Sequence, residues 1–322
     1  MIHPSCGSNE QELQSVQMKM IFDMRPISLA RHLAMRSNKA DMRTRNLQFL
    51  RLVFRDKSKS VLFATFPKSG WNWSADVINY ALHKQFLGEY SIQYESGGTL
   101  LHSVRKATIF YPADARSRRQ ERLSRRFPTL DVDLCFHTHG SWNESPLWGL
   151  DAAKTVIVAR NIPTMLFSYY RSRRSDRSFE EFVHGGALER CLEFYNSWAN
   201  FARRPHVRLR VFNYEDLHKD PVGGFGEMVS YLFDVDLPRP VLQEAVDHFS
   251  LDKQKAREFQ FSADEKSHFH FRGAVDYSDM MSPQTYRDIT GTLSERLDPM
   301  FQYLIAGRHG ADKDGARNAV VK

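Results

Sequence analysis

One segment of the chain constrains the fold more than any other: residues 61–82, which read VLFATFPKSGWNWSADVINYAL. Residues 61–66 have strand-forming side chains, a turn that contains Gly70 follows, and a helical pattern begins near Trp71. Such a turn directs backbone N–H groups and the positive end of the helix dipole at one point. The segment therefore predicts an α/β fold with a site for a phosphate-like group, to which Lys68 adds a positive charge.

Strand-like and helical segments alternate along the rest of the chain. Strands are predicted over residues 131–137, 154–160 and 206–214. Helices are predicted over residues 73–86, 163–173, 179–203, 226–233, 240–249 and 283–305. This alternation indicates an α/β fold with a central, mainly parallel sheet flanked by helices, in which ligands bind at the carboxyl ends of the strands.

We expect one domain over residues 57–306. Residues 1–56 are expected to form an N-terminal arm that is partly loose and packs on the core, and residues 307–322 are expected to form a disordered tail. Residues 88–130 are expected to form an insertion that contributes to a substrate pocket or lid.

Charge and composition exclude several classes of protein. The net charge is +7, but the basic residues are spread out, and the dense stretches 116–126 and 171–177 lack the interleaved aromatic residues of single-strand binders. A surface that attracts an anionic nucleotide explains the charge, so no nucleic-acid partner is expected. The chain has no run of about 18 apolar residues, which argues against a membrane span. Its three widely spaced cysteines suit a cytoplasmic protein. The sequence does not decide between a monomer and a homodimer.

The turn differs from the P-loop of ATPases and GTPases, because Lys68 precedes Gly70 whereas the P-loop lysine follows the last glycine. An NTP-dependent kinase is therefore a distant alternative. The text TFPKSGWNW over residues 65–73 instead resembles TYPKSGTTW, the 5′-phosphosulfate loop of the sulfotransferases that use 3′-phosphoadenosine 5′-phosphosulfate (PAPS). The resemblance implies a P-loop-like strand–loop–helix that binds PAPS through Lys68, Ser69, Gly70, Trp71, Asn72 and Trp73.

Two further blocks resemble the same family. Arg160 ends a predicted strand and Ser168 lies eight residues later, in VARNIPTMLFSYY, which is similar to the family's LVRDPRDVAVSYY. The likeness implies that Arg160 and Ser168 hold the 3′-phosphate of PAPS, for which the guanidinium fork is well shaped. Tyr214 begins the text YEDL, as in the family, where the tyrosine helps to seat the adenine; Glu215 and Asp216 are expected to cap the next helix.

His137 and His139 share one face of a predicted strand, because residues two apart on a strand point the same way. The segment resembles the family's KTH, which implies that His139 is the catalytic base and that His137 replaces a lysine. A neutral imidazole can accept a proton from a hydroxyl near pH 7. A zinc site, with His268 and His270 as further ligands, is the alternative for this pair; we expect no metal.

The weakest match is at Arg272 and Gly273, where the family has a longer RKG clamp for the 3′-phosphate. Asp276 takes the place of the second family glycine, and no tryptophan follows. Arg272 and Gly273 stay cofactor-binding candidates.

The resemblance implies an enzyme that moves the sulfuryl group of PAPS to a hydroxyl or amine of a small acceptor by in-line attack, and releases adenosine 3′,5′-bisphosphate (PAP). His139 would act as the base, Lys68 would stabilise charge on the bridging oxygen, and Ser168 would hold Lys68 back until the acceptor arrives. Aromatic residues favour an aromatic or apolar acceptor, and the candidates to bind it are Phe66, His137, Trp142 and Tyr169. The alternatives are a catalytically silent nucleotide-binding protein of the same fold and a sulfotransferase that acts on a glycan.

Overall fold

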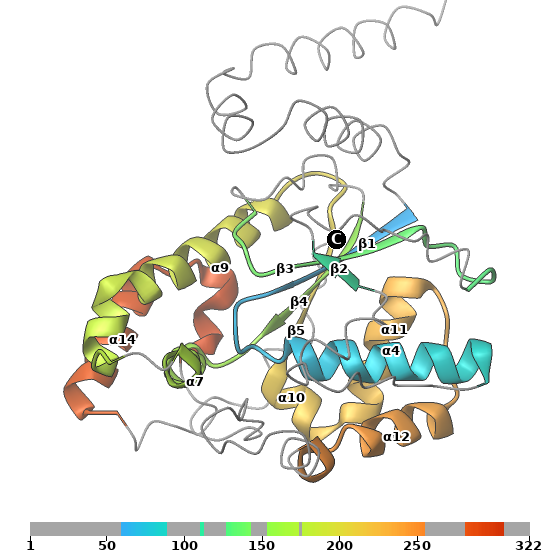
Figure 1. The fold of residues 1–322 in the computed structure, drawn as a ribbon. Coiled ribbons are helices and arrows are strands. Elements are labelled where there is room, and N and C mark those ends of the chain that lie inside the picture. Colours follow the sequence, from blue (N-terminus) through green and yellow to red (C-terminus); the bar gives the residue numbers. More distant parts are fainter. Residues whose placement is uncertain are drawn as a thin grey trace, which may run out of the picture. The chain divides into compact units, whose positions relative to one another are not determined.

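The computed structural model describes residues 59–88, 110–112, 127–142, 153–173, 176–254 and 281–305. In these ranges five strands form one sheet, in the order β2-β3-β1-β4-β5 (Figure 1). The strands are β1 Ser60–Thr65, β2 Phe110–Pro112, β3 Leu134–Thr138, β4 Lys154–Ala159 and β5 Arg208–Asn213. Every pairing between neighbouring strands is parallel, so the predicted α/β fold with a parallel sheet is confirmed.

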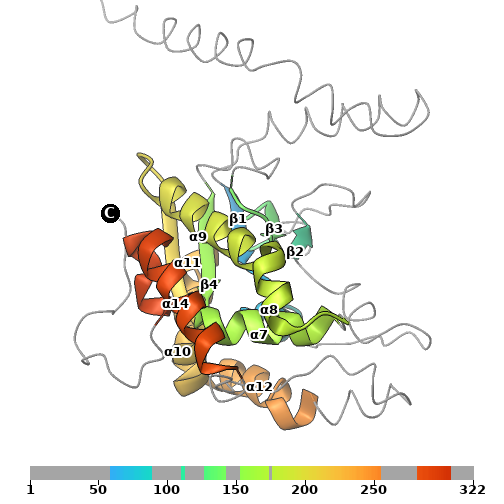
Figure 2. The same ribbon diagram turned by 90° about the vertical axis from the view of Figure 1, so that its left-hand side faces the viewer.

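Helices cover both faces of the sheet (Figures 1 and 2). On one face lie α4 Trp71–Leu87, α11 Pro221–Phe233 and α12 Arg239–His248. On the other lie α7 Ile162–Arg173, α9 Leu188–Ala202 and α14 Pro283–Arg296. The shorter elements are α8 Phe179–Phe182, the π-turn η3 Val183–Ala187, α10 Tyr214–Lys219 and the 3₁₀ helix η6 Pro299–Leu304. No helix in the described ranges is both long and apolar enough to cross a bilayer.

The central strands are apolar because both of their faces are covered. Val61 and Phe63 of β1 and Val156 and Val158 of β4 belong to one apolar core with α4 and α11. The intervening residues of both strands are buried too, as expected where helices pack on each face of a parallel sheet. This double burial fixes the strand register and with it the positions of the loops that follow the strands.

Several predicted boundaries were wrong. The helix predicted over residues 179–203 is broken, because Gly186 has a φ of 102° and η3 separates α8 from α9. The helix predicted over 283–305 ends at Arg296, since Pro299 cannot continue it, and η6 follows. Strand β2 was not predicted at all; it lies in the stretch interpreted as an insertion.

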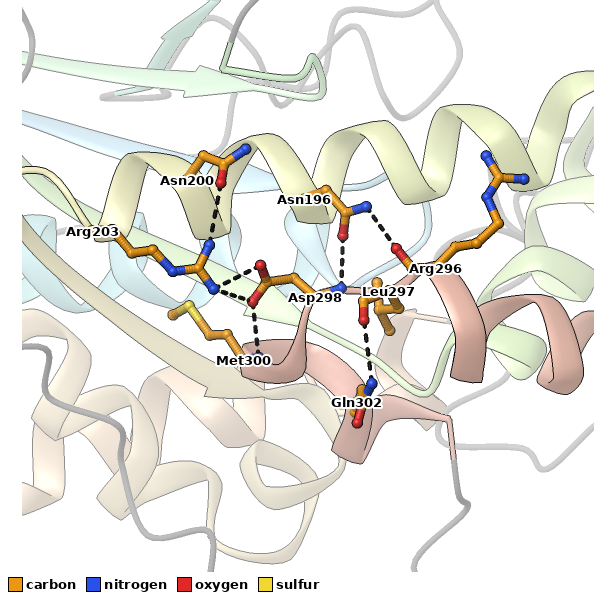
Figure 3. A network of polar contacts seen from close by, with 8 residues as sticks. All are labelled: Asn196, Asn200, Arg203, Arg296, Leu297, Asp298, Met300 and Gln302. Atoms are coloured by element: carbon orange, nitrogen blue, oxygen red, sulfur yellow. Dashed lines mark hydrogen bonds and ion pairs between the residues drawn. The ribbon is translucent and has the colours of Figure 1, made fainter.

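A polar network joins the end of α14 to α9 (Figure 3). The Asn196 amide donates to the carbonyl oxygen of Arg296 at 2.9 Å and accepts from the backbone N–H of Asp298 at 2.8 Å. One nitrogen of the Arg203 guanidinium lies 2.7 Å from both carboxylate oxygens of Asp298. These contacts satisfy backbone groups that the helix end leaves open, and they fix the C-terminal elements on the α9 side.

Candidate functional site

Four neighbouring strands end at one edge of the sheet, and each is followed by a predicted site residue. His139 comes directly after β3, the loop of residues 66–70 after β1, Arg160 after β4 and Tyr214 after β5. Because all four strands are parallel, their carboxyl ends meet at the same edge. The sheet order therefore places the imidazole, the loop, the guanidinium and the phenol ring in that sequence across the edge.

The loop after β1 has an unusual backbone. Lys68 and Gly70 both have positive φ, of 73° and 105°, and a non-glycine residue rarely adopts such a value. Gly70 is the N-cap of α4 and has no side chain that could occupy the N–H groups of the first helical turn. The N-terminus of α4 is thus left as a cradle of backbone donors, which is how proteins bind oxyanions.

Gly70 also makes room for Tyr214. A Cβ atom built on Gly70 would lie 2.5 Å from Cδ2 and 2.8 Å from Cε2 of the tyrosine ring. Only glycine therefore allows both the backbone angle and this close approach. The loop and the start of α10 are packed as one unit.

Arg160 joins the loop to the same tyrosine. Its side chain is buried, and Nη1 donates to the carbonyl oxygen of Lys68 at 3.1 Å. Its guanidinium carbon lies 4.5 Å from the centre of the Tyr214 ring, in a cation–π contact. A fixed positive charge thus stands beside the anion cradle.

Helix α7 anchors the other side of the loop. Ser69 is fully buried, and its hydroxyl donates to Sδ of Met165 at 3.1 Å. Ser168 is half-buried and lies three residues after Met165, on the same face of α7 because side chains three apart in a helix are neighbours. Asn72, the second residue of α4, is also half-buried.

An aromatic cluster lies on the α4–α10 side of Arg160. Trp73 meets Tyr214 edge to face, with ring centres 6.1 Å apart, and stacks on His218 at 4.4 Å. Burial, and then the charge of Arg160, lower the pKa of His218 to about 4, so this imidazole is neutral near pH 7. The sequence interpretation missed His218; its spacing of one helical turn from Tyr214 was the available signal.

His139 is held on the opposite side by the end of β1. Its Nδ1 lies 2.8 Å from the carbonyl oxygen of Thr65 and 3.1 Å from Thr65 Oγ1. A carbonyl oxygen can only accept, so Nδ1 carries the proton, and the acceptor lone pair of the neutral ring is on Nε2. Thr65 was not among the predicted site residues, although the end of β1 lies beside β3.

The acceptor candidates fall in different places. Phe66 is buried and makes edge-to-face contacts with Tyr169 and Phe194, which join the loop to α7 and α9. Trp142 is buried too, and it stacks on Phe201 of α9 with ring centres 3.9 Å apart. His137 stacks on Trp71 beside His139.

The cofactor-binding candidates Arg272 and Gly273 lie outside the described residues, and so do His268 and His270 of the zinc alternative.

The predicted capping role of Glu215 and Asp216 was wrong. Glu215 accepts a hydrogen bond from the backbone N–H of Asn161 at 3.1 Å, which ties α10 to the start of α7. The cap of α11 is Asp220, whose carboxylate accepts from the Gly223 N–H at 3.0 Å. Glu215 therefore braces the site edge through a contact distant in sequence, whereas Asp216 makes local contacts with Asn213 and Lys219.

Comparisons with known proteins show the fold and the family of the chain. Among solved structures, the mouse sulfotransferase SULT7A1 complexed with PAP has a TM-score of 0.53 and 15% identity, over 77% of this chain and 88% of that chain. Retinol dehydratase in complex with androsterone and PAP has a TM-score of 0.48 and 15% identity, over 78% and 85% of the two chains. The family model described as the sulfotransferase domain matches residues 58–307, well over half of the chain. The chain therefore belongs to the sulfotransferase family.

Proposed function

We propose that this sulfotransferase moves the sulfuryl group of PAPS to a hydroxyl of a small aromatic or apolar acceptor, with His139 as the base. The observation that carries the proposal is the joining, at one sheet edge, of an anion cradle with an imidazole of defined tautomer. Either feature alone occurs in many proteins. Together they provide what sulfuryl transfer requires, a seat for an anionic donor and a proton acceptor beside it.

The residues present fit PAPS. The backbone donors at Gly70 and the start of α4 suit its 5′-phosphosulfate, because no side chain fills that cradle from the cap position. Arg160, with Ser168 on the adjacent helix, suits the 3′-phosphate, and Trp73 and Tyr214 offer aromatic surface to the adenine. Bound PAPS supplies an activated sulfuryl group, whose transfer to the acceptor oxygen releases PAP.

His139 receives the acceptor's proton at Nε2. The Thr65 carbonyl then stabilises the imidazolium, because the Nδ1–H that it accepts becomes more acidic when the ring is charged. Lys68 provides a positive charge for the oxygen on which negative charge develops. The left-handed backbone of Lys68, held by Arg160, sets the position from which its side chain extends.

The test is transfer from radiolabelled PAPS to a panel of phenols, aliphatic alcohols, amines and oligosaccharides, in the presence of EDTA. We expect label on a phenol or an apolar alcohol, and a rise in melting temperature with PAP alone. Label found only on an oligosaccharide would show that the acceptor is a glycan and not a small aromatic or apolar molecule. Stabilisation by PAP without any transfer would support the silent nucleotide-binding alternative, and magnesium-dependent binding of ATP in place of PAP would overturn the proposal.

A further inference from the structure

Trp71 makes its ring contacts on the β3 side of the loop. It is the first residue of α4, yet its indole stacks on the His137 imidazole, with ring centres 4.2 Å apart and planes 17° apart. The same indole meets His139 edge to face at 6.5 Å and 88°. Phe63 supports it from β1, edge to face at 5.1 Å. The indole therefore contacts both histidines of the site.

The strand register explains this arrangement. Phe63 and His137 are direct partners across β1 and β3, so α4, which begins over the end of β1, brings its first side chain onto the pair. His137 and His139 point from the same face of the chain, with ring centres 5.7 Å and planes 73° apart. Three rings thus form a corner: Trp71 and His137 lie parallel, and His139 stands across both.

The corner packs against the imidazole that Thr65 holds by hydrogen bonds. Both contacts of the His139 imidazole with Thr65 involve Nδ1. These contacts set the tautomer and hold the Nδ1 edge of a ring that is joined to the backbone through Cβ. The Trp71 and His137 rings, which both meet the imidazole at a steep angle, add packing contacts that restrain its plane and so direct Nε2.

We propose that Trp71 and His137 form one stacked platform that fixes the ring plane of His139, and that the Trp71 side chain serves the acceptor side of the site. This inference rests on the proposed function, since it assumes that His139 is the base. Both platform residues are departures from the family text, where a hydroxyl residue and a lysine occupy these positions. Because the two rings stack, the departures at Trp71 and His137 act together, and His137 contributes ring surface to the site in place of the lysine's charge.

The experiment follows the His139 ring directly and needs no acceptor. Protein labelled with ¹⁵N-histidine is compared by NMR with Trp71→Phe, Trp71→Ala, His137→Phe and His137→Ala, and a His139→Gln variant assigns the signal. In the wild type and both Phe variants we expect one His139 signal with the Nδ1–H tautomer. In both Ala variants we expect the averaged shifts of a mobile ring, and the double Ala variant adds nothing further, because either change alone removes the stack.

Calorimetric titration with PAP separates the two sides of the site. Trp71 was expected to bind PAPS, but its indole stacks on His137 of β3, on the side of the loop away from Arg160, so all four single variants are expected to bind PAP within about twofold of the wild type. Tyr286→Ala, which removes a half-buried ring on α14, is the matched control and leaves the His139 signal unchanged. Because the Phe variants keep ring packing, their His139 signal and PAP binding can be measured even where an Ala variant does not fold.

Three outcomes would overturn the platform. The first is a His139 signal that is unchanged in the Ala variants. The second is a His137→Phe variant that behaves like His137→Ala, which would assign the effect to the imidazole itself. The third is weaker PAP binding by Trp71→Phe and Trp71→Ala with an unchanged His139 signal, which would show that the indole contacts the nucleotide. Failure of the wild type to bind PAP is a different result: it contradicts the proposed function and leaves the NMR comparison readable.

Discussion

Replacing Gly70 by Ala tests how tightly the loop and Tyr214 are built together. The new methyl group meets two costs. An alanine at a φ of 105° is strained by about 1–3 kcal/mol. Its Cβ would lie 2.5 Å from the Tyr214 ring, and relieving such an overlap in a packed site costs a further ~1–3 kcal/mol. Gly70→Ala should therefore lower the free energy of unfolding by about 2–6 kcal/mol.

Gly88→Ala is the matched control at the other end of the same helix. Gly88 also has a positive φ, of 74°, but a Cβ built there meets no atom within 4 Å. Its cost is the backbone strain alone, about 1–2 kcal/mol. Urea unfolding of both variants gives the two free energies, and their difference reports the contact with Tyr214.

The functional readout is PAP binding by calorimetry. Gly70→Ala should weaken PAP binding at least about tenfold, because moving the Tyr214 ring also disturbs Arg160, whereas Gly88→Ala should leave it unchanged. In a Tyr214→Ala background the stability cost of Gly70→Ala should shrink toward that of Gly88→Ala. Equal stability losses for the two glycine variants, with PAP binding intact in both, would refute this reasoning.

Arg160→Lys keeps the charge but loses the guanidinium fork that reaches the Lys68 carbonyl. PAP affinity measured by calorimetry should therefore fall about tenfold or more. Unchanged affinity would show that Arg160 does not bind the nucleotide. Asn161→Asp restores the residue usual in the family but loses the amide donor to the Leu304 carbonyl. Urea unfolding should show that the free energy of unfolding falls by about 1–3 kcal/mol. An unchanged free energy would contradict this hydrogen bond. The pKa of His218 is about 4 against 6.5 for an ordinary histidine, so below pH 6.5 the unfolded chain binds more protons and stability falls as the pH drops toward 4. Melting temperatures of His218→Gln should vary less over that window than those of the wild type; parallel curves would exclude His218 as the cause.

The sequence predicted the strands and the turn at this edge of the sheet because their signals are local. An apolar strand, a glycine turn and a helix start follow one another within residues 61–71, and Arg160 directly follows the apolar run of β4. Parallel pairing then brings such loops together without further information. The loop, the sheet and the helix after it could therefore be located from pattern alone.

The remaining features depend on contacts between segments far apart in the chain. Strand β2 has three residues, too few for any periodicity, and only its pairing with β3 defines it. Glu215 could be interpreted as a cap because its partner, the Asn161 backbone, lies 54 residues away. The Thr65 bond that sets the His139 tautomer spans 74 residues. No local pattern could reveal either partner.

The central claim is that the sheet edge seats PAPS and that His139 takes the acceptor's proton. The measurement that tests it most directly is sulfuryl transfer from radiolabelled PAPS by the wild type and by His139→Ala, with the PAP-induced rise in melting temperature recorded for both. We predict transfer by the wild type, none by the variant, and the same rise in melting temperature for both, because the imidazole is held by Thr65 on the side of the loop away from Arg160. Transfer by His139→Ala at the wild-type rate, or loss of its response to PAP, would contradict the claim.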